Sequence, residues 1–263
     1  MTRRRLDAEL VRRGIVASRA EAQEAVRAGL VFVDGVPASK SATMVDDAAP
    51  VVLTGAVRPY ASRAGAKLAA AIERFEVRVE GRDCLDAGAS TGGFTDCLLR
   101  AGAARVLAVD VGYGQLAWEL RTDPRVTVYE RTNVRTLDRA ALPFVPSVVV
   151  ADLSFISLRT ALPSLVALAA GDAVFVLLVK PQFEAGPADV GSGGVVRDAA
   201  VWRRVLGEVA ASADALGLGV LGAMASPVPG PAGNVEFLLF GRRDAASVRL
   251  DLDAVVDEGR AIA

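Results

Sequence analysis

The stretch LDAGASTGGF, residues 85–94, decides the fold of this chain. It joins the end of an apolar strand to the start of a helix through a turn rich in glycine. Glycine lets such a turn bend sharply, and it lets a ligand approach the backbone closely at the amino end of the helix. We therefore expect a strand–turn–helix unit of an α/β sheet, with a ligand site at the turn.

From residue 80 onward, apolar segments of strand length alternate with helical segments. The predicted strands are residues 83–88, 105–112, 125–130, 147–155 and 173–180. Continuous apolar strands are typical of a parallel sheet that helices cover on both faces. The pattern predicts an α/β fold with a doubly wound, Rossmann-like sheet. The turn GPAG, residues 230–233, stands before the last apolar run and predicts an antiparallel hairpin at the sheet edge.

Residues around the glycine turn are candidates for binding a cofactor. Asp110 ends the second strand, 22 residues after Gly88, where a carboxylate accepts hydrogen bonds from ribose hydroxyls. A dinucleotide, S-adenosylmethionine or a plain tight turn without a ligand fits that pattern. Asp86 favours S-adenosylmethionine, because a carboxylate repels a pyrophosphate and attracts the cationic methionine end. The candidate residues are Asp86, Gly88, Ala89, Ser90, Thr91, Gly92, Gly93, Phe94, Asp110 and, for the adenine edge, Asn133.

Two ionisable residues, Asp152 and Lys180, end the fourth and fifth predicted strands, where open α/β sheets bind ligands. Lysine can lose its proton in a protein and arginine cannot, yet only three of the 30 basic residues are lysines. Lys180 is therefore a candidate proton acceptor, and a structural ion pair with Asp152 is the alternative. Lys67 and Glu236 are further candidates, for which a solvated helix start and an edge-strand charge are the alternatives.

The first 57 residues predict a small α+β domain. We expect one helix at residues 3–14, a second that begins at the capping box Ser18-Arg-Ala-Glu21, and short strands. Residues 1–40 carry eight basic side chains against five acidic ones. This excess predicts binding of RNA phosphates, and a merely solvated basic surface is the alternative. The candidate RNA-binding residues are Arg3, Arg4, Arg5, Arg12, Arg13, Arg19 and Arg27.

A linker without strong periodicity is predicted at residues 58–64, so that residues 65–263 form the larger domain. The chain has no histidine, which excludes histidine-based triads and histidine metal sites, and we expect no metal. Its two cysteines make no disulfide framework and favour a reducing compartment. The amino end lacks the apolar region of a secretory signal. We expect a cytoplasmic protein that does not enter a membrane.

Five motifs, taken together, resemble the TlyA family of ribosomal-RNA 2′-O-methyltransferases. They are SRAGAKL (62–68), LDAGASTGGFTDCLL (85–99), ADLSFISL (151–158), LVKPQFE (178–184) and NVEFLL (234–239). The resemblance extends over nearly the whole chain. It implies an FtsJ-type methyltransferase domain that uses S-adenosylmethionine, and an RNA-binding domain like that of a ribosomal small-subunit protein. It also implies cytidines in the ribosomal RNA of both subunits as substrates.

The resemblance further implies a catalytic Lys-Asp-Lys-Glu tetrad, which falls on Lys67, Asp152, Lys180 and Glu236. Relatives often carry a tryptophan in the joint, where this chain has Arg58-Pro-Tyr-Ala61. Two other functions are possible. The family is also labelled haemolysin, but the sequence offers no segment suited to membrane lysis. An RNA-binding protein with an inactive methyltransferase fold is the second, and the intact tetrad argues against it.

Overall fold

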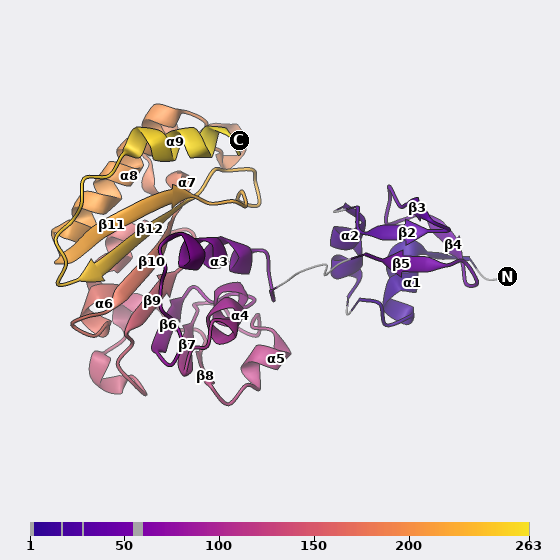
Figure 1. Ribbon diagram of the computed structural model, residues 1–263, viewed down its shortest axis with the longest axis horizontal. Helices are drawn as coiled ribbons and strands as arrows, with labels where there is room; N and C mark the ends of the chain where they lie inside the picture. The colour runs from indigo at the N-terminus through magenta and orange to yellow at the C-terminus, as the bar shows by residue number, and fades with distance from the viewer. Residues whose placement is uncertain (1–2, 17, 28, 55–59, 263) are drawn as a thin grey trace. The chain divides into compact units, whose positions relative to one another are not determined.

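The computed structural model describes residues 3–16, 18–27, 29–54 and 60–262. Contacts divide the chain into two compact units, residues 1–59 and 60–263, and each is described by itself (Figure 1). Residues 58 and 59 of the predicted linker lie outside the described residues.

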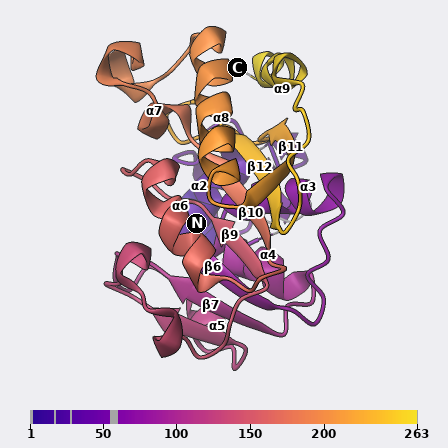
Figure 2. The same ribbon diagram turned by 90° about the vertical axis from the view of Figure 1, so that its left-hand side faces the viewer.

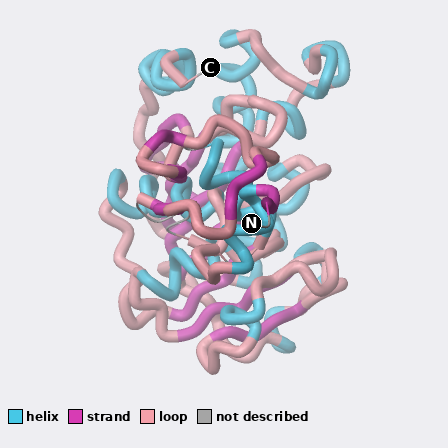
Figure 3. The backbone as a smooth tube through the Cα atoms, turned by 90° about the vertical axis from the view of Figure 1, so that its right-hand side faces the viewer, coloured by secondary structure: helices cyan, strands magenta, loops and turns pink. Residues whose placement is uncertain are grey.

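The amino-terminal unit is a small α+β domain of short strands and two helices (Figure 3). Its elements are β1 (Arg3–Arg5), α1 (Leu6–Arg12), α2 (Arg19–Arg27), β2 (Val31–Val33), β3 (Val36–Pro37), β4 (Met44–Asp46) and β5 (Val51–Leu53). Strand β1 pairs with β4, and β2 lies between β3 and β5. A separate core forms around the buried side chains of Leu6, Leu10 and Val31.

The helix predicted at residues 3–14 is wrong at its start. Arg3–Arg5 form a strand antiparallel to β4, and the helix begins at Leu6, whose side chain is fully buried. The strand keeps three cations exposed while the backbone makes sheet hydrogen bonds. The predicted capping residue of the second helix is confirmed, because the Glu21 amide donates to Ser18 Oγ at 3.2 Å.

The larger unit is built on a mixed seven-stranded sheet in the order β11-β12-β10-β9-β6-β7-β8. Its strands are β6 (Asp83–Ala87), β7 (Arg105–Val109), β8 (Val126–Tyr129), β9 (Val148–Ala151), β10 (Val174–Val179), β11 (Leu218–Ala225) and β12 (Phe237–Arg243). Strands β6 to β10 are parallel, as predicted. The closing hairpin is antiparallel, but its second strand, β12, inserts between β10 and β11. That insertion places the residues before β12 next to the end of β10.

Helices cover both faces of this sheet. The helices are α3 (Ala64–Arg74), α4 (Gly93–Arg100), α5 (Trp118–Arg121), α6 (Leu158–Leu168), α7 (Pro181–Glu184), α8 (Ala199–Asp214) and α9 (Leu252–Arg260), with short 3₁₀ turns at Val134–Thr136, Arg139–Ala141, Pro187–Asp189 and Ser192–Gly194. Side chains from α6, α8 and α9 pack in one apolar core, and those from α3, α4 and α5 pack in another. Figure 2 shows α6 and α8 in front of the strands. Among the described residues, no helix is long and apolar enough to cross a membrane.

The site depends on where the parallel strands end. Strand β9 was expected to extend to residue 155, but it ends at Ala151, and residues 152–157 form a loop before α6. The adjacent strand β10 ends at Val179, and Lys180 is the single residue that joins it to α7. Because β9 and β10 are parallel neighbours, Asp152 and Lys180 lie at the same edge of the sheet, directly after their strands.

Candidate functional site

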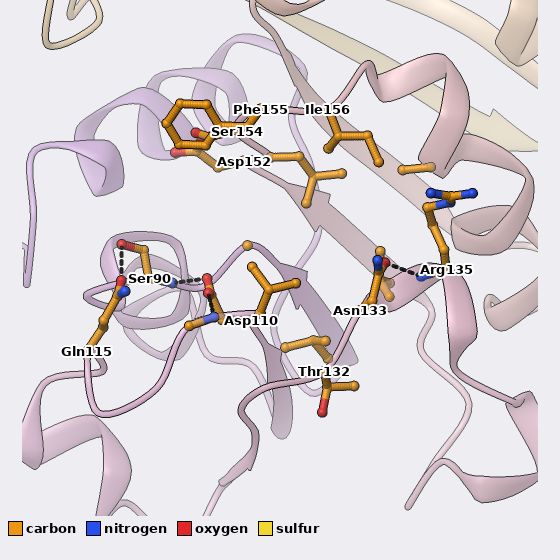
Figure 4. Close-up of a pocket in the computed structure, with 17 residues that line it drawn as sticks. Ser90, Asp110, Gln115, Thr132, Asn133, Arg135, Asp152, Ser154, Phe155 and Ile156 are labelled. Carbon is orange, nitrogen blue, oxygen red and sulfur yellow. Dashed lines mark hydrogen bonds between the residues drawn. The ribbon is translucent and has the colours of Figure 1, made fainter.

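A cavity of about 520 Å³ lies at the carboxyl ends of the parallel strands (Figure 4). Its volume is within the range of roughly 300–1,000 Å³ that small-molecule sites occupy. The walls come from the glycine turn after β6, the loops after β7 and β8, and the loop after β9. Of the predicted cofactor residues and catalytic residues, the cavity is lined by Gly88, Ser90, Asp110, Asn133 and Asp152.

Asp110 is fixed by backbone donors on two sides. Its Oδ2 accepts from the Ser90 amide at 2.8 Å, and its Oδ1 accepts from the Gly112 amide at 2.6 Å. These bonds join the glycine turn to the loop after β7 and aim the carboxylate along the cavity wall (Figure 4). Each carboxylate oxygen has further lone pairs, so Asp110 retains capacity for hydroxyl donors. No motif pointed to Gln115, whose Oε1 accepts from Ser90 Oγ at 3.3 Å.

Two glycines of the turn are required by close backbone packing. Gly88 has a φ of +85°, and a Cβ there would lie 2.4 Å from the backbone oxygen of Asp152. A Cβ on Gly93 would lie 2.9 Å from the backbone nitrogen of Gly65, near the start of α3. The first approach brings the turn against the loop after β9, and the second brings α3, with Lys67, against α4. The glycines therefore assemble the site as well as leaving room for a ligand.

Asp86 lines none of the three cavities that residues of the glycine turn help to form. The side chain is fully buried below the turn, where Oδ2 accepts from Thr95 Oγ1 at 2.7 Å and Oδ1 has no hydrogen-bond partner among the described residues. Burial raises the pKa of Asp86 to about 7. The structure therefore places this acid away from the surface on which the sequence expected it to meet a ligand.

Other predicted cofactor residues occupy different surroundings. Asn133 lines the large cavity, and its side chain also accepts from the Arg135 amide at 3.0 Å. A smaller hollow of about 80 Å³, between the glycine turn and the start of α3, is lined by Ala89, Thr91, Gly93 and Phe94 together with Ser62, Ala64, Gly88, Ser90 and Asp152. Gly92 lies at the amino end of α4 and lines neither space.

Lys180 and Asp152 form an ion pair across neighbouring strand ends. Lys180 Nζ lies 2.6 Å from Asp152 Oδ1 and donates to Ser154 Oγ at 2.8 Å. The Lys180 side chain is 10% exposed, so most of its charge is withdrawn from bulk water. Asp152 and Ser154 both line the cavity, which places the amine beside it. The sequence predicted Asp152 here, and it missed Ser154.

Lys67 and Glu236 form the second ion pair of the predicted tetrad. Lys67 from α3 contacts Glu236, which stands just before β12, and the two side chains are 5% and 1% exposed. Gln182 on α7 donates to the second Glu236 oxygen at 3.4 Å. Because Gln182 is two residues after Lys180, this contact connects the second pair to the segment that carries the first. The tetrad is thus one buried and one largely buried ion pair, formed by residues from four separate parts of the chain.

Phe155 is an aromatic side chain that the sequence did not single out. The residue is 92% exposed, it lines the cavity, and its backbone has a φ of +63°. Bulky side chains rarely adopt that left-handed conformation, so the surrounding contacts must hold it. The Phe183 ring supports it at 5.3 Å between centroids.

The arrangement suits a proton transfer beside a nucleoside-sized cavity. It offers an amine that is shielded from water, one carboxylate, Asp152, that holds it, and a second carboxylate, Asp110, that can bind hydroxyls. No group of three or more potential metal ligands occurs within residues 3–262 where the structure describes them, so the geometry provides no metal centre there.

Two buried acids organise the candidate RNA-binding arginines of the amino-terminal unit. Asp7 and Glu9 are both fully buried. Arg5 donates to both Asp7 oxygens, at 3.1 and 2.8 Å, and Arg19 donates to one of them at 3.1 Å. Hydrogen bonding from Arg5 holds the pKa of Asp7 well below its usual range. Both arginines are about half exposed, so they remain available to a partner.

The other predicted arginines differ in availability. Arg12 pairs with Glu9 and is 50% exposed, and Arg27 pairs with Glu24 and is 70% exposed. Arg13 is only 20% exposed, and it donates to backbone carbonyls that follow β4 as well as to Glu9. Arg13 therefore serves the fold of this unit. Arg3 and Arg4 stand on the exposed strand β1.

Known proteins resemble this chain over both units. The FtsJ-like methyltransferase family matches residues 60–243, and the S4 domain matches residues 4–49. The 16S/23S rRNA (cytidine-2'-O)-methyltransferase TlyA of Mycobacterium tuberculosis is 56% identical over 91% of this chain and 90% of its own length. Hemolysin A of Brachyspira hyodysenteriae is 39% identical over 89% of this chain and 98% of its own length. A solved structure named "Putative hemolysin from Streptococcus thermophilus" has a TM-score of 0.78 and 38% identity, covering 100% of this chain and 97% of its own.

Substitution of Asp86 by asparagine tests the electrostatic account of the buried acid. The folded pKa of about 7 lies above the ordinary carboxyl value of 3.8, so folding favours the protonated form. This group therefore costs stability progressively as the pH rises from about 4 to 7, and by a constant amount above that. We expect Asp86→Asn to be more stable than the wild type at pH 8, by up to about 4 kcal/mol, and nearly equal to it at pH 4.

Denaturant unfolding of both proteins without ligand, at pH 4 and pH 8, measures this difference. The other titrating groups are common to the two proteins, so groups that do not interact with Asp86 cancel in the difference. An Asp86→Asn protein that is less stable than the wild type at pH 8 contradicts the account.

Proposed function

The chain belongs to the TlyA family of FtsJ-like methyltransferases, and on this basis we propose that it transfers a methyl group from S-adenosylmethionine to a ribose 2′-hydroxyl of ribosomal RNA. The Mycobacterium tuberculosis relative is named for cytidines of 16S and 23S RNA, and we propose the same nucleoside and both subunits here. The observation that carries the proposal is the shielded Lys180 amine, held by Asp152 and Ser154 beside the cavity. We also propose that the protein acts in the cytoplasm, because that is where a ribosomal substrate would be.

The cavity fits S-adenosylmethionine in size and in chemistry. Asp110 offers carboxylate oxygens for two ribose hydroxyls, and Asn133 offers an amide group for the adenine edge. The turn at Gly88 and Ser90 presents backbone to the same space. Asp86 supplies a negative charge below the turn when it is ionised, which a cationic methionine end would favour. When bound, the cofactor supplies an electrophilic methyl group on a positively charged sulfur.

Lys180 serves as the general base in this proposal. The 2′-hydroxyl must lose its proton as its oxygen bonds to the methyl carbon. Lys180, which forms an ion pair with Asp152, must first release one proton to solvent. Its neutral amine then takes the hydroxyl proton and returns to the ammonium form. Asp152 stabilises the ammonium that forms, because its oxygen lies 2.6 Å from Nζ. Ser154 fixes the direction of the amine. Correct alignment of hydroxyl and amine supplies much of the rate, and general-base catalysis typically adds about 10²–10⁴-fold.

Lys67 and Glu236 complete the catalytic group. Their near-complete burial as an ion pair keeps both side chains in a fixed geometry. We assign Lys67 to binding and orienting the ribose oxygen, as a cation that does not itself take the proton. Glu236 orients Lys67, and Gln182 adds a donor to Glu236 from the segment that follows Lys180.

The RNA is held by the amino-terminal unit and by the rim of the cavity. We propose that residues 1–57 form the RNA-binding domain, residues 58–64 the linker and residues 65–263 the catalytic domain. Arg5 and Arg19 present half-exposed guanidinium groups to phosphates, held in place by a buried acid. At the cavity, the exposed Phe155 ring suits stacking of an unpaired base.

Substitution of Asp110 by alanine tests the cofactor site. It removes the acceptors for two ribose hydroxyls and also releases the Ser90 and Gly112 amides. We expect S-adenosylmethionine binding to weaken by roughly 2–4 kcal/mol, measured by isothermal titration calorimetry. Asp253→Ala is the control, because it removes an exposed carboxylate on α9 that does not line the cavity. Unchanged affinity in Asp110→Ala, or stronger binding of NAD than of S-adenosylmethionine, contradicts the assignment.

Substitution of Lys180 by arginine tests the proposed reaction. Arginine keeps the charge, and so the attraction to Asp152, but it cannot give up a proton at any accessible pH. We expect methyl transfer to ribosomal RNA to fall by at least about 10²-fold in a single-turnover assay. The melting temperature and the affinity for S-adenosylmethionine should stay close to those of the wild type.

Lys40→Arg makes the same chemical change in the amino-terminal unit and should leave the rate almost unchanged at saturating RNA. Near-normal turnover in Lys180→Arg would mean that Lys180 acts only as a cation. Loss of folding together with activity would favour a structural ion pair with Asp152. Absence of methyl transfer by the wild type would favour an RNA-binding protein with an inactive methyltransferase fold.

A further inference from the structure

Glu184 is a buried carboxylate that the proposed reaction does not use. It ends the short helix α7, four residues after Lys180, and its side chain is 2% exposed. A charge so far removed from water requires strong partners. The partners that the structure gives its side chain are Ser157, the last residue of the loop at residues 152–157, and Leu158 and Arg159, the first two residues of α6.

The Glu184 carboxylate binds the carboxyl-terminal end of that loop, where it meets α6. Ser157 Oγ donates to Oε2 at 2.6 Å, and the Leu158 amide donates to Oε1. Arg159 Nε donates to Oε2 at 3.3 Å, and its Nη2 donates to the Glu184 carbonyl at 3.0 Å. The negative charge also lies at the amino end of α6, where the helix dipole stabilises it. One buried group thus replaces the side-chain cap that Ser157 does not provide.

The same two segments meet at two more places. Asp152 and Ser154 contact the Lys180 amine at the near end, and the rings of Phe155 and Phe183 meet at 5.3 Å in the middle. Between these contacts the loop holds Phe155 in its unfavourable left-handed conformation. The loop is therefore anchored at both ends. Lys180 holds the end at Asp152, and Glu184 holds the end at Ser157.

We infer that Glu184 is a positioning residue for methyl transfer: it anchors the loop at residues 152–157 and so holds Asp152 and Ser154 on the Lys180 amine. This inference rests on the proposed function, because Lys180 is the group whose alignment is at stake. Glu184 acts through the loop and does not touch the cavity. Its effect should fall on the rate of the chemical step and leave cofactor binding largely intact.

Two variants and one control test the inference in the full-length protein. Glu184→Gln keeps the shape but turns one acceptor into a donor that faces Arg159 Nε. Ser157→Ala removes one hydroxyl donor to Glu184 and leaves the carboxylate in place. Glu208→Gln is the control. Glu208 on α8 accepts a hydrogen bond from Arg159 Nη1 at 2.9 Å, makes no hydrogen bond or ion pair with the loop at residues 152–157, and is 40% exposed.

Methyl transfer to ribosomal RNA is measured for each variant, with the melting temperature and the affinity for S-adenosylmethionine. We expect kcat to fall by roughly 10- to 100-fold in Glu184→Gln and by roughly 3- to 10-fold in Ser157→Ala, as for a small misplacement of reacting groups. KM for RNA and the cofactor affinity should change less than threefold. Glu208→Gln should match the wild type.

Lysine NMR gives a readout that does not depend on activity. With lysine labelled at the ε-carbon and ζ-nitrogen, the chain gives only three side-chain signals, from Lys40, Lys67 and Lys180. Lys40→Arg and Lys180→Arg assign them. We expect the Lys180 signal to shift in Glu184→Gln and in Ser157→Ala, while the Lys40 signal stays in place.

Wild-type kcat or an unmoved Lys180 signal in Ser157→Ala overturns the inference, and so does a loss of cofactor affinity as large as the loss of kcat in Glu184→Gln. If Glu184→Gln does not fold, Ser157→Ala decides. If the wild type itself transfers no methyl group to ribosomal RNA, the proposed function fails, whereas the Lys180 signal still tests the contact between Glu184 and the loop.

Discussion

The ion pair between Lys180 and Asp152 is the interaction on which the rest of the site depends. A lysine at the end of a buried strand loses most of its hydration, so a carboxylate must lie within contact distance for the fold to tolerate the charge. Parallel pairing of β9 with β10 provides that carboxylate, because it ends the two strands side by side. The same edge of the sheet carries the glycine turn and the cavity. The need to pair the buried Lys180 with Asp152 therefore places the lysine amine next to a cavity that can accept a nucleoside.

Buried acids that hold exposed or reactive cations recur through both units. Glu236 holds Lys67, Glu184 holds Arg159, and Asp7 holds Arg5 and Arg19. In each case the acid pays a desolvation cost that several charged hydrogen bonds offset, and the cation is left in a defined direction. For methyl transfer such rigidity is useful, since the reaction needs alignment of a hydroxyl, a methyl group and a base more than it needs a strong nucleophile.

Much of the larger unit could be predicted from sequence because its signals are local. Runs of apolar residues predicted the five parallel strands. An ionisable residue at the end of such a run identified Asp110 and Lys180 as candidate site residues. The insertion of β12 and the depth of Asp86 could not be predicted, because strand order and burial depend on contacts between distant segments. Glu184 was hidden for the same reason, since its partners lie 25–27 residues away. The structural role of Arg13 in the amino-terminal unit could not be predicted either, because it depends on a hydrogen bond to the distant Ala49 carbonyl.

The position of the transferred methyl group tests the central claim most directly. Ribosomal RNA from a strain that lacks the protein is incubated with the purified protein and S-adenosylmethionine that carries a labelled methyl group, and is then hydrolysed in alkali. A 2′-O-methyl group blocks attack of the ribose oxygen on the neighbouring phosphate, so the label is predicted to remain in alkali-resistant dinucleotides with cytidine at the 5′ position. Label in single nucleotides, which would mean a methyl group on a base, contradicts the account.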